Sequence, residues 1–142
     1  MITDVINEGA RPILERMVQF AGQRHRLIVN NVANFDTPGF RPTDVSVEAF
    51  QENLAEAVDA RRARGPDGAL RPADTDEVEF LHDGLILHPQ AIGDNILFHD
   101  GNDRDLERTM QDLVENFLTF RTAAELLRNR FELINTAIRE RV

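Results

Sequence analysis

The sequence of 142 residues contains no cysteine, tryptophan, tyrosine or lysine. Without cysteine the chain has no disulfide framework, no thiolate metal site and no cysteine nucleophile. Its nine phenylalanines are the only aromatic side chains, so a stacking platform for bases or sugars would have to be built from phenylalanine alone. We therefore expect stability to come from packing within the chain or from partners.

Long hydrophobic runs are also absent. No segment approaches the roughly 18 consecutive apolar residues that a membrane-spanning helix needs. Residues 1–8 have neither a basic nor an apolar segment, so we expect no cleaved secretory signal. The net charge is −9, and all of it resides in residues 65–112, which hold 12 acidic residues and three arginines. The rest of the chain holds 13 acidic residues and 13 arginines. This charge balance argues against a nucleic-acid ligand.

What the sequence does contain is a long helical pattern at its C-terminal end. Apolar residues follow one another at alternating spacings of four and three, which is the a/d seam of a coiled coil. No glycine or proline interrupts residues 103–142, so the pattern predicts one helix of about 55 Å, which needs a partner along its length. The seam consists of Leu106, Met110, Leu113, Phe117, Phe120, Ala124, Leu127, Phe131, Ile134 and Ile138.

A second helical pattern near the N-terminus supplies the expected partner. It predicts a helix over residues 12–33, in which Arg24 interrupts the apolar series and Gly22 indicates either a close helix approach or mere tolerance. The seam that we expect to pack against the C-terminal helix and against neighbouring subunits consists of Ile13, Met17, Phe20 and Leu27. A second stripe widens the apolar face and consists of Leu14, Val18, Ala21, Ile28 and Val32.

A proline–glycine pair ends this first helix. Pro38 pushes Thr37 into an extended conformation, and Pro38-Gly39 suits the two central positions of a type II turn. A shorter helix is predicted over residues 46–64, with Ser46 as its cap and a Gly-Pro pair at its end.

A small hairpin is predicted beyond that helix. Residues 78–80 alternate in polarity and residues 85–87 are apolar, while Asp83-Gly84 is typical of a two-residue hairpin loop. Residues 88–102 read as an irregular connector.

These patterns together predict a mainly α, elongated protein. Long N- and C-terminal helices pack in a coiled-coil-like manner, and a short central insert contains a helix and a small β-hairpin. We expect one elongated unit over residues 1–142, divided into an N-terminal helix (1–34), an insert (35–102) and a C-terminal helix (103–142).

No motif points to an active site, and we expect no catalytic, cofactor-binding or metal-binding residues. His82, His88 and His99 lack the spacing of a zinc site. The acidic segment that begins at Asp100 has its glycine at the wrong position for an EF-hand and lacks the terminal glutamate. Ser46, the only serine, has no nucleophile context.

Two segments resemble the flagellar axial proteins, the family of rod, hook and hook-associated subunits. The first is similar to the family's N-terminal pattern N-I-A-N-x-x-T-P-G-Y through Asn31, Ala33, Asn34, Asp36, Thr37, Pro38, Gly39 and Phe40. The second resembles the C-terminal region of a short rod subunit through Asp100, Gly101, Asn102 and Asp105. The short chain length agrees with the rod subunits rather than the hook proteins.

This resemblance implies a structural subunit of the flagellar basal-body rod at its proximal end, which does no chemistry and transmits torque through packed helices. It implies other rod subunits, basal-body ring proteins and export-gate proteins as partners. It also implies export through the flagellar type III apparatus without a cleaved signal peptide. Residues 31–39 would fix the chain reversal where the first helix ends.

Three alternatives remain at this point. The chain could be another rod subunit or a divergent copy of the standard one. A soluble helical adaptor or chaperone-like protein would use the same seam to dimerise or to grip a partner helix. A metal-dependent enzyme using the histidines is a distant third.

Overall fold

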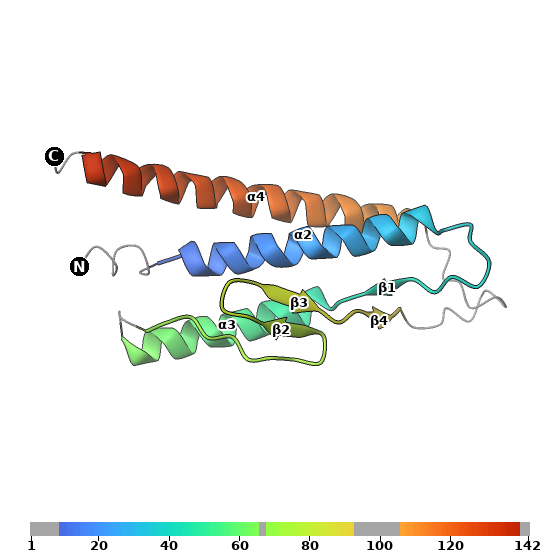
Figure 1. Ribbon diagram of the computed structural model, residues 1–142, viewed down its shortest axis with the longest axis horizontal. Coiled ribbons are helices and arrows are strands. Elements are labelled where there is room, and N and C mark those ends of the chain that lie inside the picture. The colour runs from blue at the N-terminus through green and yellow to red at the C-terminus, as the bar shows by residue number, and fades with distance from the viewer. Residues whose placement is uncertain (1–8, 66–67, 93–105, 140–142) are drawn as a thin grey trace.

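The computed structural model describes residues 9–65, 68–92 and 106–139. These residues form an elongated, mainly helical molecule in which two long helices lie side by side (Figure 1). This confirms the fold class that the periodicity predicts. In chain order the elements are α2 (Arg11–Ala33), β1 (Thr43–Asp44), α3 (Val47–Arg64), β2 (Val78–Phe80), β3 (Leu85–Leu87), β4 (Gln90–Ala91) and α4 (Leu106–Arg139).

The helices begin and end where local chemistry requires it. Pro12 lies in the first turn of α2, where its missing N–H has no helical partner to lose. The Ser46 hydroxyl accepts a hydrogen bond from the Ala49 N–H at 3.1 Å, so the predicted cap of α3 is confirmed. The same helix ends at Gly65, whose φ of 98° favours glycine.

The β-hairpin forms as predicted, but its loop lies one residue earlier than the sequence indicates. Phe80 pairs with Leu85, and the Leu81 N–H donates to the Gly84 carbonyl at 2.9 Å. The tight turn is therefore at His82-Asp83, and Gly84 does not have a positive φ. The prediction of Asp83-Gly84 as the loop pair is wrong, because the cross-strand pairing of the two apolar strands fixes the register.

A second short pairing was not anticipated from the sequence. Strand β1 pairs antiparallel with β4, with Thr43 opposite Ala91 and Asp44 opposite Gln90. The interpretation of residues 88–102 as irregular is therefore wrong at β4. Two-residue strands carry too little periodicity to be recognised.

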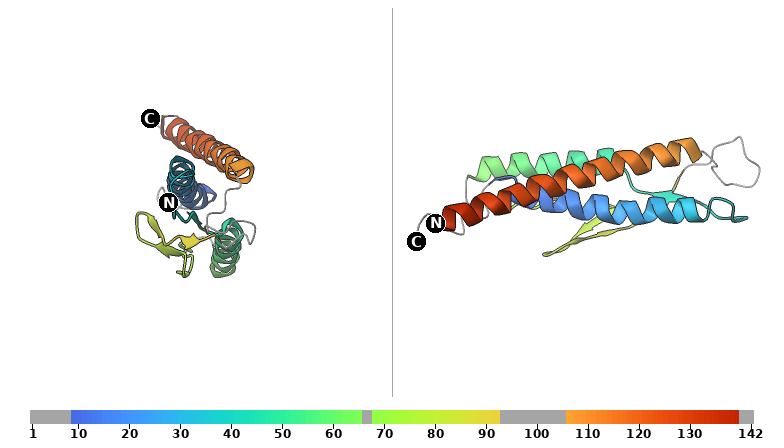
Figure 2. Two further views of the ribbon diagram at one scale, coloured as in Figure 1. Left: turned by 90° about the vertical axis from the view of Figure 1, so that its right-hand side faces the viewer. Right: turned by 90° about the horizontal axis from the view of Figure 1, so that it is seen from above.

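Helix α2 is the centre of the molecule. Helix α4 covers one side of it, and α3 and the hairpin cover the other (Figure 2). A buried apolar cluster lies on the α3 and hairpin side and contains Phe20, Val45, Phe50, Leu54, Val78 and Leu85. Phe20 and Phe50 stack with ring centroids 3.9 Å apart.

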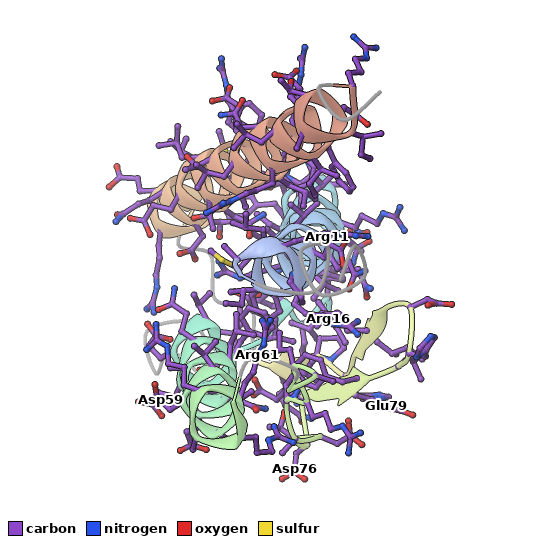
Figure 3. The ribbon with its side chains drawn as sticks, turned by 90° about the vertical axis from the view of Figure 1, so that its left-hand side faces the viewer. Arg11, Arg16, Asp59, Arg61, Asp76 and Glu79 are labelled. Carbon is purple, nitrogen blue, oxygen red and sulfur yellow. The ribbon has the colours of Figure 1, made fainter. Side chains whose placement is uncertain are left out.

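Polar residues of α2 and α3 fix these elements to one another (Figure 3). The Arg16 guanidinium donates to the carbonyls of Leu81, His82 and Gly84 in the hairpin. The Arg61 guanidinium of α3 donates to the Gly9 carbonyl at 3.0 Å, next to the beginning of α2. None of the described helices is long and apolar enough to cross a membrane.

Candidate assembly interface

Helix α4 contacts α2 through small and polar residues. Of its 34 residues, only Asn116 and Ala123 are buried. The Asn116 side chain donates a hydrogen bond to the Ala21 carbonyl at 2.8 Å, and a Cβ added at Gly22 would lie 3.5 Å from the Phe120 ring. Gly22 therefore marks a close helix approach.

The predicted seam of α2 contacts the buried cluster. Ile13, Met17 and Leu27 pack against the buried cluster that contains Phe20, on the side of α3 and the hairpin. Helix α4 meets the stripe centred on Ala21, on which Leu14 and Ile28 are buried at intervals of seven residues. Packing of the Ile13, Met17, Phe20 and Leu27 seam on α4 and on neighbouring subunits therefore stays a prediction, beside the contacts that these residues make with the buried cluster.

The predicted seam of α4 is only partly covered by α2. Leu113, Leu127 and Ile134 are half-buried, whereas Leu106, Met110, Phe117, Phe120, Phe131 and Ile138 are 37–50% exposed. The physical reason is that Asn116 and Ala123 allow a closer approach to α2 than a row of leucine and phenylalanine would. Phe131 still contacts α2 at its first residue, because the Arg11 guanidinium lies 5.0 Å from the centre of its ring.

As a result α4 carries an extensive exposed apolar surface. Besides the six exposed seam residues, Val114, Leu118, Leu126 and Leu133 are 49–62% exposed. A contiguous apolar surface of this kind marks an interaction site in a folded protein. Among the described residues, α4 is the main candidate for an interface with other molecules.

The chain reversal after α2 is held by the residues that carry the first resemblance. The buried Asn31 side chain donates to the Thr43 carbonyl at 2.8 Å and accepts from the Thr43 N–H at 3.2 Å. The Asn34 side chain donates to the Asn30 carbonyl at 2.9 Å. Asn31 thus joins the end of α2 to β1 as a strand neighbour would.

The turn itself has type II geometry. The Phe40 N–H donates to the Thr37 carbonyl at 3.2 Å. Gly39, at the third position of this turn, has the positive φ of 75° that type II requires. Ala33, Asp36, Thr37, Pro38 and Gly39 are exposed, and Phe40 is half-buried. The second resemblance lies outside the described residues, since it consists of Asp100, Gly101, Asn102 and Asp105. The predicted start of the C-terminal helix at residue 103 and residues 1–8, where no signal is expected, also lie outside them.

A buried ion pair beside this reversal was not found from the sequence. The Arg24 guanidinium donates to both carboxylate oxygens of Asp44, at 2.9 and 2.6 Å, and lies 3.9 Å from the Asp112 carboxylate of α4. Burial lowers the pKa of Arg24, but its hydrogen bond and charge contact with Asp44 outweigh that effect and raise it. Burial raises the pKa of Asp112, and the nearby Arg24 only partly opposes this. The available signal was the arginine that breaks an apolar series, which marks a charge with a partner.

The histidines do not converge. His88 lies 3.4 Å from the Glu79 carboxylate, and His82 is on the exposed hairpin turn. Within residues 9–65, 68–92 and 106–139, no group of three metal-ligating side chains is found. His99 lies outside these ranges.

Comparison with known proteins extends the likeness over most of the chain. No family model matches it. The chain is 23% identical over 125 residues to the flagellar basal body rod protein FlgB of Bacillus subtilis (strain 168), with 88% of this chain and 89% of the relative covered. It is 27% identical over 137 residues to FlgB of Borrelia hermsii, with 94% and 98% covered. FlgB of Yersinia enterocolitica is 24% identical over 133 residues, with 84% and 86% covered. The resemblance to rod proteins that the two motifs indicate is therefore confirmed.

Proposed function

We propose that this chain is a structural subunit of the bacterial flagellar basal-body rod, at the proximal end of the rod. The similarity to FlgB proteins along most of both chains supports this role. The observation that carries the proposal is that the chain combines this similarity with an α4 whose large apolar side chains are mostly exposed. A subunit that completes its core only in an assembly has such a surface.

The subunit acts as one elongated unit and assembles by packing its helices against neighbours. The exposed seam residues of α4 bury against adjacent subunits, and this packing makes the rod stiff enough to transmit torque. Residues 31–40 hold the chain reversal at the end of α2, so that β1 and α3 keep a fixed position beside it. The role involves no catalysis and no cofactor.

Its partners are other rod subunits together with basal-body ring and export-gate proteins. The chain reaches the periplasmic rod through the flagellar export apparatus, without cleavage of a signal peptide. Absence of cysteine and a helix that gains most of its burial in the assembly both suit passage in an unfolded state.

Mass spectrometry of purified hook-basal bodies from the source organism tests this proposal. We expect the polypeptide as a stoichiometric component, with its N-terminal residues retained. Deletion of its gene should abolish rod assembly, and the intact gene should restore it. Presence in the basal body with a dispensable gene would favour a divergent copy or another rod subunit such as FlgC. Absence from basal bodies of a strain that makes the protein would favour the helical adaptor.

A further inference from the structure

A groove runs between α3 and the N-terminal half of α4, with α2 as its floor. Both helices pack on the same α2, and the space between them has a volume of about 810 Å³. Half-buried apolar residues, Ile13 and Met17 of α2 and Val58 of α3, lie along it. It has the apolar floor and helical walls that accept the apolar face of another helix.

The walls of this groove are acidic. Its lining includes five acidic residues and three arginines, a net charge of −2. Asp112 and Glu115 stand on the α4 wall. The Arg24 guanidinium lies 3.9 Å from the Asp112 carboxylate but donates its hydrogen bonds to Asp44. Burial raises the pKa of Asp112, and Arg24 and Arg108 only partly oppose this. A further cation would stabilise its ionised form.

The C-terminal half of α4 has the complementary properties. Residues 121–139 hold four arginines and two glutamates, a net charge of +2. Leu126, Arg130, Leu133 and Ala137 are all exposed and follow the i, i+4, i+7, i+11 spacing of a helix that enters a groove. Arg121 and Arg128 pair with glutamates of their own helix, whereas Arg130 has no ion pair with any described residue.

This face cannot reach the groove of its own molecule. The groove wall and the face of Leu126 and Leu133 belong to one continuous helix, α4, and a helix does not fold back on itself. The C-terminal end of α4 also extends beyond the beginning of α2 (Figure 1). A C-terminal half of α4 that enters this groove therefore belongs to another molecule.

We propose that the groove between α3 and the N-terminal half of α4 binds the C-terminal half of α4 from a second copy of this chain. Leu126 and Leu133 of the second copy enter the apolar floor, and its Arg130 lies against Asp112 and Glu115. The proposal rests on the proposed assembly role and identifies its contact surfaces.

In a parallel arrangement of the copies the contact is heterologous and open-ended, whereas an antiparallel pair would use both surfaces reciprocally in a closed dimer. Each parallel copy offers its groove to one neighbour and its C-terminal face to another, which generates a continuous array rather than a closed dimer. About 17 residues separate the middle of the groove wall from the middle of the face. Parallel copies are therefore displaced by about 25 Å along the helix axis.

Cysteine pairs test the contact directly, because the chain has no cysteine of its own. The double variant Val58→Cys, Leu133→Cys is expressed in a strain that lacks the wild-type gene, and its basal bodies are purified and oxidised. We expect a ladder of disulfide-linked copies. Ile138→Cys replaces Leu133→Cys in the matched control, since Ile138 is comparably exposed but lies on another face of α4, and it should give no ladder.

A charge exchange provides an independent measurement. Arg130→Glu should lower the amount of chain in basal bodies by about tenfold or more, and Glu115→Arg in the same chain should restore it. Arg128→Glu makes the same charge change outside the row of Leu126, Arg130 and Leu133. It breaks an exposed pair with Glu132, which contributes little, and should lower the amount much less.

The outcomes separate the two proposals. A wild-type chain that is absent from basal bodies overturns the assembly role itself. An assembled double-cysteine chain without a ladder overturns the groove contact alone, as does an Arg130→Glu variant that assembles as well as Arg128→Glu. Cross-linking of Leu133→Cys to a different polypeptide instead of a second copy also overturns it.

Discussion

Asn31 makes the two backbone-like hydrogen bonds that bring the chain back after α2. Its buried side-chain amide donates a hydrogen bond to the Thr43 carbonyl and accepts one from the Thr43 N–H. Asn31→Ala should lower the free energy of unfolding by about 1–3 kcal/mol, because two partly buried backbone groups lose their partner. Urea denaturation followed by circular dichroism measures this.

The neighbouring Asn30→Ala is the control for that change. Asn30 is exposed, and its side chain takes part only in a local contact with Asn34. Its effect should stay within about 0.5 kcal/mol. Equal effects at the two positions would contradict a special role for the Asn31 amide.

Asp112 predicts a pH dependence of stability. The groups that face it are Arg24 of α2, Asp44 of β1, and Arg108 and Glu115 of its own helix. Its pKa is raised above the ordinary value of 3.8, so the folded chain binds more protons than the unfolded chain in the window just above that value. The contribution of Asp112 to stability is therefore largest in acid and falls as the pH rises through this window.

Asp112→Asn removes the ionised carboxylate while keeping its shape. The variant should be more stable than wild type at pH 7, by less than about 1 kcal/mol because the side chain is 35% exposed. As the pH falls below the ordinary pKa of 3.8, the carboxyl becomes protonated in both the folded and the unfolded chain, and the difference should disappear. Urea denaturation at both pH values checks this, and an advantage that grows in acid would contradict it.

Single residues were predictable from sequence where their role is local. The Ser46 cap and the Pro38-Gly39 turn depend on a few neighbouring residues, so their chemistry can be recognised directly. The pairing of Arg24 with Asp44 joins residues 20 positions apart, and it depends on the chain reversal between them. An arginine inside an apolar series indicates that a partner exists but does not say which acid it is.

At the scale of elements, helix positions followed from periodicity and helix faces did not. The apolar rows of α2 and α4 predict two long helices, which the structure contains. Each helix, however, has more than one apolar row. The small residues Ala21, Asn116 and Ala123 decide which rows meet, because they permit the closest approach. In α2 the row with larger side chains packs on α3 and the hairpin, and in α4 the corresponding row is half-buried or exposed.

Gly22 tests this close approach. A Cβ at this position would make an ordinary contact with the Phe120 ring at 3.5 Å. Gly22→Ala should therefore be tolerated and raise the free energy of unfolding by about 0.5–1 kcal/mol, since alanine favours the helix. Gly22→Leu should displace Phe120 and lower stability by about 1–3 kcal/mol through overpacking. Urea denaturation compares the two, and a destabilising alanine would show that the helices are closer than described.

The whole molecule is asymmetric in how it buries apolar surface. Helix α2 is covered on both sides, whereas α4 is covered on one side only and presents large apolar side chains to solvent. The sequence predicts that a helix of this length needs a partner. The heptad spacing alone does not indicate which residues of α4 contact α2 and which are left for another molecule. The fold makes that division, so the assembly surface is defined only once α2 and α4 are in contact.

Phe117→Asp separates folding from assembly. Phe117 is 50% exposed on α4, so a charge at this position costs the isolated chain little, and its urea denaturation should match wild type within about 0.5 kcal/mol. In the proposed assembly the same position is buried against a neighbour, where an unpaired carboxylate is strongly unfavourable. The variant should therefore be absent from purified basal bodies, and cells that carry it should not swim. Gln111→Asp introduces the same charge at an exposed polar position of the same helix and should assemble. Normal incorporation of Phe117→Asp would contradict the assignment of this face of α4 to the interface, because a buried seam does not tolerate a charge at its centre.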